Sequence, residues 1–306
     1  MLLAATDPLG HVLDKTLFET PIGPFTMNTL SLFVASAGAV LILVLAARSI
    51  GTGPASEGAD RYVTKNRFAH VIEVVVLFLR SNILEPSLGS LTNKFAPFLL
   101  TVFFFIWFNN LFGLIPLIDL QYAVTTVLFG EESKVIGGTP TGRLAVTGAL
   151  ALIAFVVWHV AGIVMSGPRA WASHFTAGAP WFMWPVMIPV EVVGAVVKPS
   201  ALAIRLFANM TAGHVLLAVV IGFTGGAVGA VGVLGGLPVA LVAFAGGVAI
   251  FFLEVFVATL QAFIFTVLTT IFLSQMVHHH HDDEHVAEAY DKDHAAVDDP
   301  STAVAA

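Results

Sequence analysis

The chain has 306 residues, of which 57% are hydrophobic and 11% are charged, and its mean hydropathy is +0.90. Water-soluble domains carry about 25% charged residues, so this composition excludes an ordinary soluble protein and indicates a polytopic membrane protein. The 13 Lys and Arg residues form no basic cluster of the kind that binds nucleic acid, and the absence of cysteine excludes disulfides and thiolate metal sites.

The apolar stretches define the expected membrane domain, residues 26–276. Residues 1–25 lack the basic start and short apolar core of a signal peptide, and we expect them to form an external N-terminal segment. A helix needs about 20 apolar residues to cross the hydrocarbon of a bilayer. Five stretches meet that length, namely residues 26–47, 96–118, 144–165, 185–223 and 237–276. We therefore predict an all-α membrane protein with five spans.

The last two stretches are each close to 40 residues long. A helix of that length extends about 60 Å, twice the thickness of the bilayer core, so each must be strongly tilted, bent or broken. Their connection carries no charge and is rich in glycine, at positions 225, 226, 229, 232, 235 and 236. These features predict a long, strongly tilted helical hairpin with a flexible turn close to the membrane surface.

Charged residues outside the spans indicate the orientation. Residues 62–84 mix charged with apolar side chains, which fits an amphipathic helix at the interface better than a crossing. Of the Lys and Arg residues in the loops, eight fall on one side and three on the other. The excess of positive charge predicts a cytoplasmic C-terminus and an N-terminus outside. The acidic, His-rich segment 277–306 is expected to be a disordered cytoplasmic tail rather than a dedicated metal site.

Ionisable residues inside the long spans are the candidate functional groups. Each costs about 2.5 to 3.5 kcal/mol on insertion, so such residues usually mark ion pathways. They are Glu191, Lys198, Arg205, His214 and Glu254. The first three recur every seven residues and share one stripe, with about 10 Å between neighbours, so we expect them to be too far apart for simple ion pairs.

The chemistry of these groups favours a proton path with a barrier. His214 and Glu254 are side chains that exchange protons, and from adjacent helices they form a candidate relay pair through water. Arg205 keeps its charge, so it repels a passing proton and attracts a carboxylate. Asn209 lies one turn beyond Arg205, and Gln261 shares a stripe with Glu254.

Three motifs resemble the subunit a family of the F-type ATP synthase. The chain resembles this family from about residue 65 to residue 276, in order and with matching spacing. The motifs are KPSALAIRLFANM at 198–210 with the following TAGH, TLQAFIFTVLT at 259–269, and NNLFGLIP at 109–116.

The resemblance implies a role for each candidate residue. Arg205 matches the stator arginine that meets the carboxylates of the c ring one at a time. Asn209 and Gln261 match its polar neighbours, and Glu191 and Lys198 match channel-lining positions. Many bacterial members carry an acid where His214 stands and a His where Glu254 stands, so this chain has the pair exchanged. Gly142 and Arg143 replace the family's usual polar pair before the third span.

The resemblance also implies the function and the partners. A stator subunit of this family provides two offset proton half-channels to and from the c ring, which couples proton flow to rotation and to ATP synthesis or hydrolysis. Nucleotide sites lie on other subunits, so we expect no catalysis by this chain alone, no cofactor and no metal. The implied partners are the c ring, the peripheral-stalk b-type subunits and the lipid of a bacterial inner membrane.

The residues by themselves leave alternatives open. A stand-alone ion-coupled secondary transporter also carries midplane charges, although the chain lacks two related halves. A membrane haem or metal enzyme needs more histidines within spans than His159 and His214 provide. Lys198 could instead extend to the interface, and Asn209 and Gln261 could join neighbouring helices by hydrogen bonds. We expect His159 to be structural.

Overall fold

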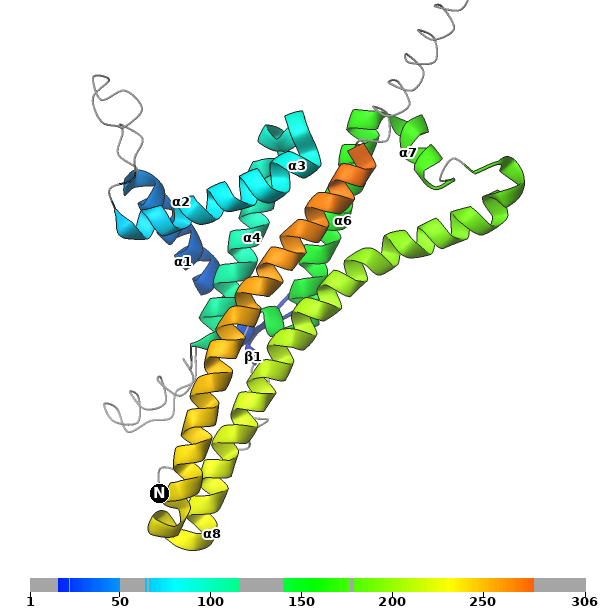
Figure 1. Ribbon diagram of the computed structural model, residues 1–306. Helices are drawn as coiled ribbons and strands as arrows, with labels where there is room; N and C mark the ends of the chain where they lie inside the picture. Colours follow the sequence, from blue (N-terminus) through cyan, green and yellow to red (C-terminus); the bar gives the residue numbers. More distant parts are fainter. Residues whose placement is uncertain are drawn as a thin grey trace, which may run out of the picture. The chain divides into compact units, whose positions relative to one another are not determined.

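A computed structural model describes residues 16–21, 23–49, 64, 66–115, 140–176 and 179–277, and Figure 1 shows the elements they form. The strands and longer helices are β1 (Thr16–Thr20), β2 (Gly23–Thr26), α1 (Met27–Ser49), α2 (Arg67–Leu79), α3 (Glu85–Leu88), α4 (Thr92–Leu114), α6 (Leu144–Ser166), α7 (Pro168–His174) and α8 (Trp184–Val277). Short turns of other helical types are η2 (Arg80–Leu84), η3 (Gly89–Leu91), η4 (Pro140–Gly142) and η5 (Trp181–Met183). The predicted helical class is confirmed, and the antiparallel hairpin of β1 and β2 is an additional element that the sequence did not predict.

Five helical stretches among the described residues are long and apolar enough to cross a membrane. They are Met27–Ser49, Arg67–Leu114, Leu144–Ser166, Trp181–Leu217 and Gly235–Val277. This finding confirms the expected number of spans. Helices suit this environment because each backbone N–H and C=O finds a partner within its own segment, where no water is available.

Helix α8 is a hairpin of two arms. It covers 94 residues, and Gly232 interrupts it with φ 73° and ψ 174°. A side chain at that φ would be strained, so glycine is the residue that allows the chain to reverse there. We call residues 184–231 the first arm and residues 233–277 the second arm. The glycine-rich turn that the sequence predicted is thus confirmed at Gly232.

The chain divides into two compact units, which are described separately. Unit 1 contains Met1–Leu150 and Ala201–Val267, and unit 2 contains Ala151–Ser200 and Leu268–Ala306. Within unit 1 the two arms of α8 run side by side toward the turn (Figure 1). Of the predicted acidic tail, residues 277–306, Val277 is the last residue of α8, and residues 278–306 lie outside the described residues.

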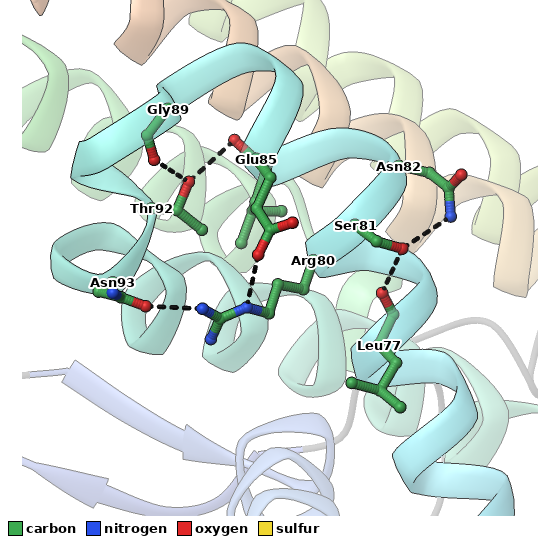
Figure 2. Close-up of polar contacts among 9 residues, drawn as sticks. Leu77, Arg80, Ser81, Asn82, Glu85, Gly89, Thr92 and Asn93 are labelled. Carbon is green, nitrogen blue, oxygen red and sulfur yellow. Dashed lines mark hydrogen bonds and ion pairs between the residues drawn. The ribbon is translucent and has the colours of Figure 1, made fainter.

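A polar corner in unit 1 joins α2 to α4 (Figure 2). Arg80 donates from Nε to Oε1 of Glu85 at 2.9 Å and from Nη2 to Oδ1 of Asn93 at 2.8 Å. Gly89 ends α3 with a φ of 52°, and the Thr92 hydroxyl donates to its carbonyl at 2.8 Å. These hydrogen bonds hold the corner between the amphipathic α2 and α4.

Side-chain hydrogen bonds fix the other helices of unit 1. Trp107 on α4 donates from Nε1 to Oγ1 of Thr259 on the second arm at 3.0 Å. Arg143, just before α6, donates from Nη1 to Oγ1 of Thr26 at 2.6 Å and to Oγ1 of Thr29 at 3.2 Å. Arg143 therefore joins the start of α6 to the start of α1.

Unit 2 packs α7 and both ends of α8 around α6. Trp158 on α6 is buried and its ring lies 5.0 Å from that of Phe272 on the second arm, edge to face. Ser166 is within 3.3 Å of the carbonyl of Met276 and donates to it. Gly162 faces Trp171 of α7, and a Cβ there would lie 3.2 Å from Cδ1 of that indole. The small residue thus lets α7 approach α6 closely.

Candidate functional site

The centre of the candidate site is a buried carboxyl group on the second arm of α8. Glu254 is 7% exposed and lies against Gly213 of the first arm, where an added Cβ would overlap Oε1 of the carboxyl and lie 3.2 Å from its Cγ. A cavity of about 200 Å³ adjoins the pair and is also lined by Asn209, Leu114 and Leu253. Gly213 therefore creates the space that the carboxyl group occupies.

Among the described residues that line this cavity, Glu254 has a buried polar atom without a protein hydrogen-bond partner, Oε2. Elsewhere in unit 1, Nε2 of His214 and Nε2 of Gln261 are also buried without such a partner among the described residues. A buried polar atom left unpaired costs about 1 to 3 kcal/mol. Water that bridges such atoms removes that cost, and a cavity of this size has room for several molecules. The cavity is therefore suited to hold water that pairs with Oε2 of Glu254.

Helix α4 closes the site on one side. Asn110 is fully buried and donates from Nδ2 to the carbonyl of Ala258, one turn beyond Glu254, at 3.3 Å. Leu114 packs against Met210 and Ala258 in the small core that the two arms share. Together these contacts hold the Glu254 segment at a fixed distance from the first arm.

In the sequence Asn110 is marked only as part of the motif at 109–116, and no role is predicted for it. Its neighbour Asn109 turns inward to its own helix and donates to the carbonyl of Phe105 at 2.8 Å. Gly213 was likewise quoted without a role. Since glycine has no side chain, no chemical signal in the sequence distinguishes it from the other 26 glycines of the chain.

His214 is partly buried and follows Gly213, the residue of the first arm that contacts Glu254. The relay between His214 and Glu254, and the bridging water that it requires, remain predictions.

Arg205 is exposed, in contrast to the buried Glu254. It makes no ion pair with any of the residues that the structure describes. Leu206, the next residue, is fully buried, so the first arm presents Arg205 on its outer face and packs its other face inside unit 1. A guanidinium on an apolar outer face is available to a partner.

Glu191 and Lys198 lie in unit 2 and form an ion pair, so the expectation that they are too far apart was wrong. Nζ of Lys198 is 3.6 Å from Oε1 of Glu191. The expectation used the spacing of the backbone along the helix and left out the length of the side chains. Side chains on a helix lean toward its N-terminus, and the long lysine chain therefore reaches back across two turns.

The remaining polar residues of unit 2 have structural contacts. His159 hydrogen-bonds through Nδ1 to the carbonyl of Phe155 at 2.8 Å and its ring lies 4.1 Å from the Phe155 ring. Ser166, the last residue of α6, donates to the carbonyl of Met276, and the ring of Trp171 packs against that of His159. Among the described residues no three side chains of His, Asp or Glu gather into a metal site. The His-rich segment that begins at residue 278 lies outside the described part.

Taken together, the fold defines a multi-pass helical membrane protein with a buried carboxyl group and water-sized space between two arms of a long hairpin. The sequence profile of the family described as ATP synthase A chain matches residues 27–274. The chain therefore belongs to the ATP synthase subunit a family.

Individual relatives agree with this assignment. ATP synthase subunit a of Myxococcus xanthus is 40% identical over 230 residues, which cover 74% of this chain and 67% of that protein. ATP synthase subunit a of Chloroherpeton thalassium is 34% identical over 299 residues, which cover 93% of this chain and 79% of that protein. Subunit a 2 of Chlorobaculum tepidum is 34% identical over 296 residues, 92% of this chain and 76% of that protein. The predicted family is thus confirmed.

Proposed function

We propose that this chain is the stator subunit that supplies two offset proton half-channels to a rotating ring of c subunits. Membership of the family supports a proton-translocating role within the membrane sector of an ATP synthase. The finer assignment rests on one contrast within unit 1. Glu254 is buried beside a cavity, whereas Arg205 is exposed on the outer face of the facing arm.

This contrast fits a path with a barrier. The cavity, Glu254, His214 and the polar atoms of Asn209 and Gln261 form the wall of one half-channel. A carboxyl and an imidazole both gain and lose protons, so with bridging water they pass protons inward. The exposed guanidinium keeps its charge, meets the ring carboxylate in its ionised form and prevents direct passage between the half-channels.

Glu191 and Lys198 line the second half-channel in this proposal. Their ion pair places a carboxylate and an ammonium on the part of the first arm of α8 that belongs to unit 2. Each charge crossing the membrane provides about 2.3 kcal/mol per 100 mV of membrane potential. Because the half-channels are offset, a proton travels from one to the other only by riding on the ring, and the electrical energy is converted into rotation.

The surroundings follow from the same proposal. In this proposal the chain consists of an external segment 1–25, a membrane domain 26–276 and a cytoplasmic tail 277–306. The N-terminus then lies in the periplasm and the C-terminus in the cytoplasm of a bacterial cell, with the membrane domain in its inner membrane. The exposed face with Arg205 meets the c ring, and other surfaces meet the b-type subunits. ATP is made or hydrolysed on other subunits.

The test is ATP-driven proton pumping in inside-out vesicles that contain the assembled complex. Arg205→Ala is expected to abolish pumping while the complex still forms. Each single change, His214→Glu or Glu254→His, is expected to reduce pumping. The double variant that carries both changes is expected to recover part of the lost pumping. Full pumping by Arg205→Ala would refute the barrier role. If the protein purified without the c ring still transports ions, a stand-alone transporter is favoured instead.

A further inference from the structure

The ammonium group of Lys198 has an aromatic neighbour in addition to the carboxylate of Glu191. Nζ of Lys198 lies over the ring of Phe272, 5.4 Å from its centre, and 3.6 Å from Oε1 of Glu191. Lys198 and Glu191 belong to the first arm of α8 and Phe272 belongs to the second arm, and all three lie in unit 2. The charged end of the lysine therefore joins the two arms of the hairpin.

We propose that Phe272 is a positioning residue that holds the Lys198 ammonium group against the Glu191 carboxylate through a cation–π contact. The inference rests on the proposed function, in which Glu191 and Lys198 line a half-channel, and it adds the residue of the second arm that fixes their ion pair. In the sequence Phe272 is one of 25 phenylalanines and carries no signal of such a role.

The chemistry of the ring suits this task. A cation within about 6 Å of the centre of an aromatic ring is attracted by the negative charge on the ring face. A lysine on an apolar helix otherwise extends its ammonium group to water at the interface. Here the lysine side chain is 31% exposed and its nitrogen is directed to the ring and the carboxylate. The ring attracts the ammonium group without adding a second group that takes up a proton.

The ring of Phe272 is itself held in place by helix α6. Its centre lies 5.0 Å from that of the Trp158 ring, and the two planes meet at 71°, which is the edge-to-face arrangement that aromatic pairs favour. Trp158 is 1% exposed, and Leu273, the residue after Phe272, is fully buried. The ring therefore offers the ammonium group a fixed point on the second arm.

The carboxylate of Glu191 has a further neighbour in unit 2. Nε2 of His174, the last residue of α7, lies 3.5 Å from Oε1 of Glu191. The ring of Phe272 contacts the lysine end of the ion pair, and the contact of His174 does not depend on it. A change at Phe272 therefore alters the position of Lys198 and leaves the contact between His174 and Glu191 in place.

The first experiment measures how fast an N-hydroxysuccinimide ester acylates Lys198 in the assembled complex, with mass spectrometry of the labelled peptide as the readout. Phenylalanines with an increasing number of ring fluorines are placed at position 272, because fluorine weakens the attraction of the ring for a cation and changes its size little. An amine held between ring and carboxylate is less available to the reagent. Acylation is therefore expected to rise with each fluorine, by about fivefold in all.

Phe263 is the matched control for the fluorine series. It lies on the same arm, is partly buried and also has one aromatic neighbour, since its ring lies 6.3 Å from that of Phe78. Among the described residues no cation lies over the Phe263 ring. Fluorination at position 263 is expected to leave the acylation of Lys198 and the rate of pumping unchanged.

The second readout is ATP-driven proton pumping by the same complexes. Phe272→Leu is expected to lower the rate by about fivefold, as the loss of a cation–π contact at a partly exposed site predicts, and Phe272→Tyr is expected to restore it. The fluorinated forms are expected to slow pumping in the order in which they speed acylation. A ring that only fills space would give equal pumping across the series.

The outcomes separate this inference from the proposed function. Equal acylation of Lys198 across the fluorine series would overturn the cation–π contact, and graded acylation with unchanged pumping would overturn the positioning role. Where Phe272→Leu reduces the subunit a content of the complex, the fluorinated forms, which keep the size of the ring, decide. Full pumping by Arg205→Ala refutes the proposed function, whereas graded acylation in that same background still supports the contact of Phe272 with Lys198.

Discussion

Gly213 provides the sharpest test of the geometry around Glu254. An alanine Cβ at this position would overlap Oε1 of the carboxyl group and lie 2.9 Å from its Cδ. Glu254 must then rotate away from the first arm. We therefore expect Gly213→Ala to displace the one buried carboxyl that the described residues hold between the two arms.

The magnitude follows from two opposing terms. Overpacking a closely packed site costs about 1 to 3 kcal/mol. Replacing glycine by alanine within a helix returns about 1 kcal/mol. The net loss of stability is thus about 0 to 2 kcal/mol, whereas a displacement of about 1 Å at a reacting group costs about 100-fold in rate. Proton pumping is expected to fall much more than the melting temperature.

The assay compares pumping rate and thermal unfolding of the purified complex for Gly213→Ala and Gly246→Ala. The control glycine lies on the second arm and has nothing within 4 Å of an added Cβ, so its replacement is expected to leave pumping close to the wild type and to raise stability by about 1 kcal/mol. Shortening the carboxyl side chain by Glu254→Asp in the Gly213→Ala background is expected to recover part of the pumping. Equal pumping by the two alanine variants would refute the argument that Gly213 makes room for Glu254.

Two further changes test contacts that hold unit 1 together. Arg143→Ala removes the hydrogen bonds to Thr26 and Thr29 and, because one donor is charged, is expected to lower the free energy of unfolding by about 1.5 to 3 kcal/mol, measured by thermal unfolding in detergent. Trp107→Phe removes the bond to Thr259 and keeps most of the ring packing, so a smaller loss of about 0.5 to 1.5 kcal/mol is expected from the same measurement. An unchanged melting temperature for Arg143→Ala, or a loss for Trp107→Phe larger than that of Arg143→Ala, would contradict these assignments.

A surface ion pair provides the control for both. Arg80 and Glu85 are 41% and 49% exposed, and exposed pairs contribute about 0 to 1 kcal/mol. Arg80→Ala is therefore expected to leave the melting temperature of the complex nearly unchanged, although Arg80 donates hydrogen bonds to both Glu85 and Asn93 (Figure 2).

The sequence by itself determined the helical class, the number of spans and the position of the turn. A bilayer requires long apolar segments whose backbone groups are paired internally, so segment length and hydropathy decide where helices cross. Gly232 could be placed within a turn because glycine and the absence of charge mark the connection between two long stretches. The candidate ionisable residues could be found for the same reason, since a charge inside an apolar segment is costly and conspicuous.

Only the tertiary structure decided which of these residues meet. The contact of Gly213 with Glu254, the contact of His174 with Glu191 and the bond from Asn110 to Ala258 all join positions far apart in the sequence. None has a local signal, because the approach of two helices depends on how their surfaces interlock. The sequence determined which groups are available for proton transfer, and the packing of the helices decided which of them are neighbours.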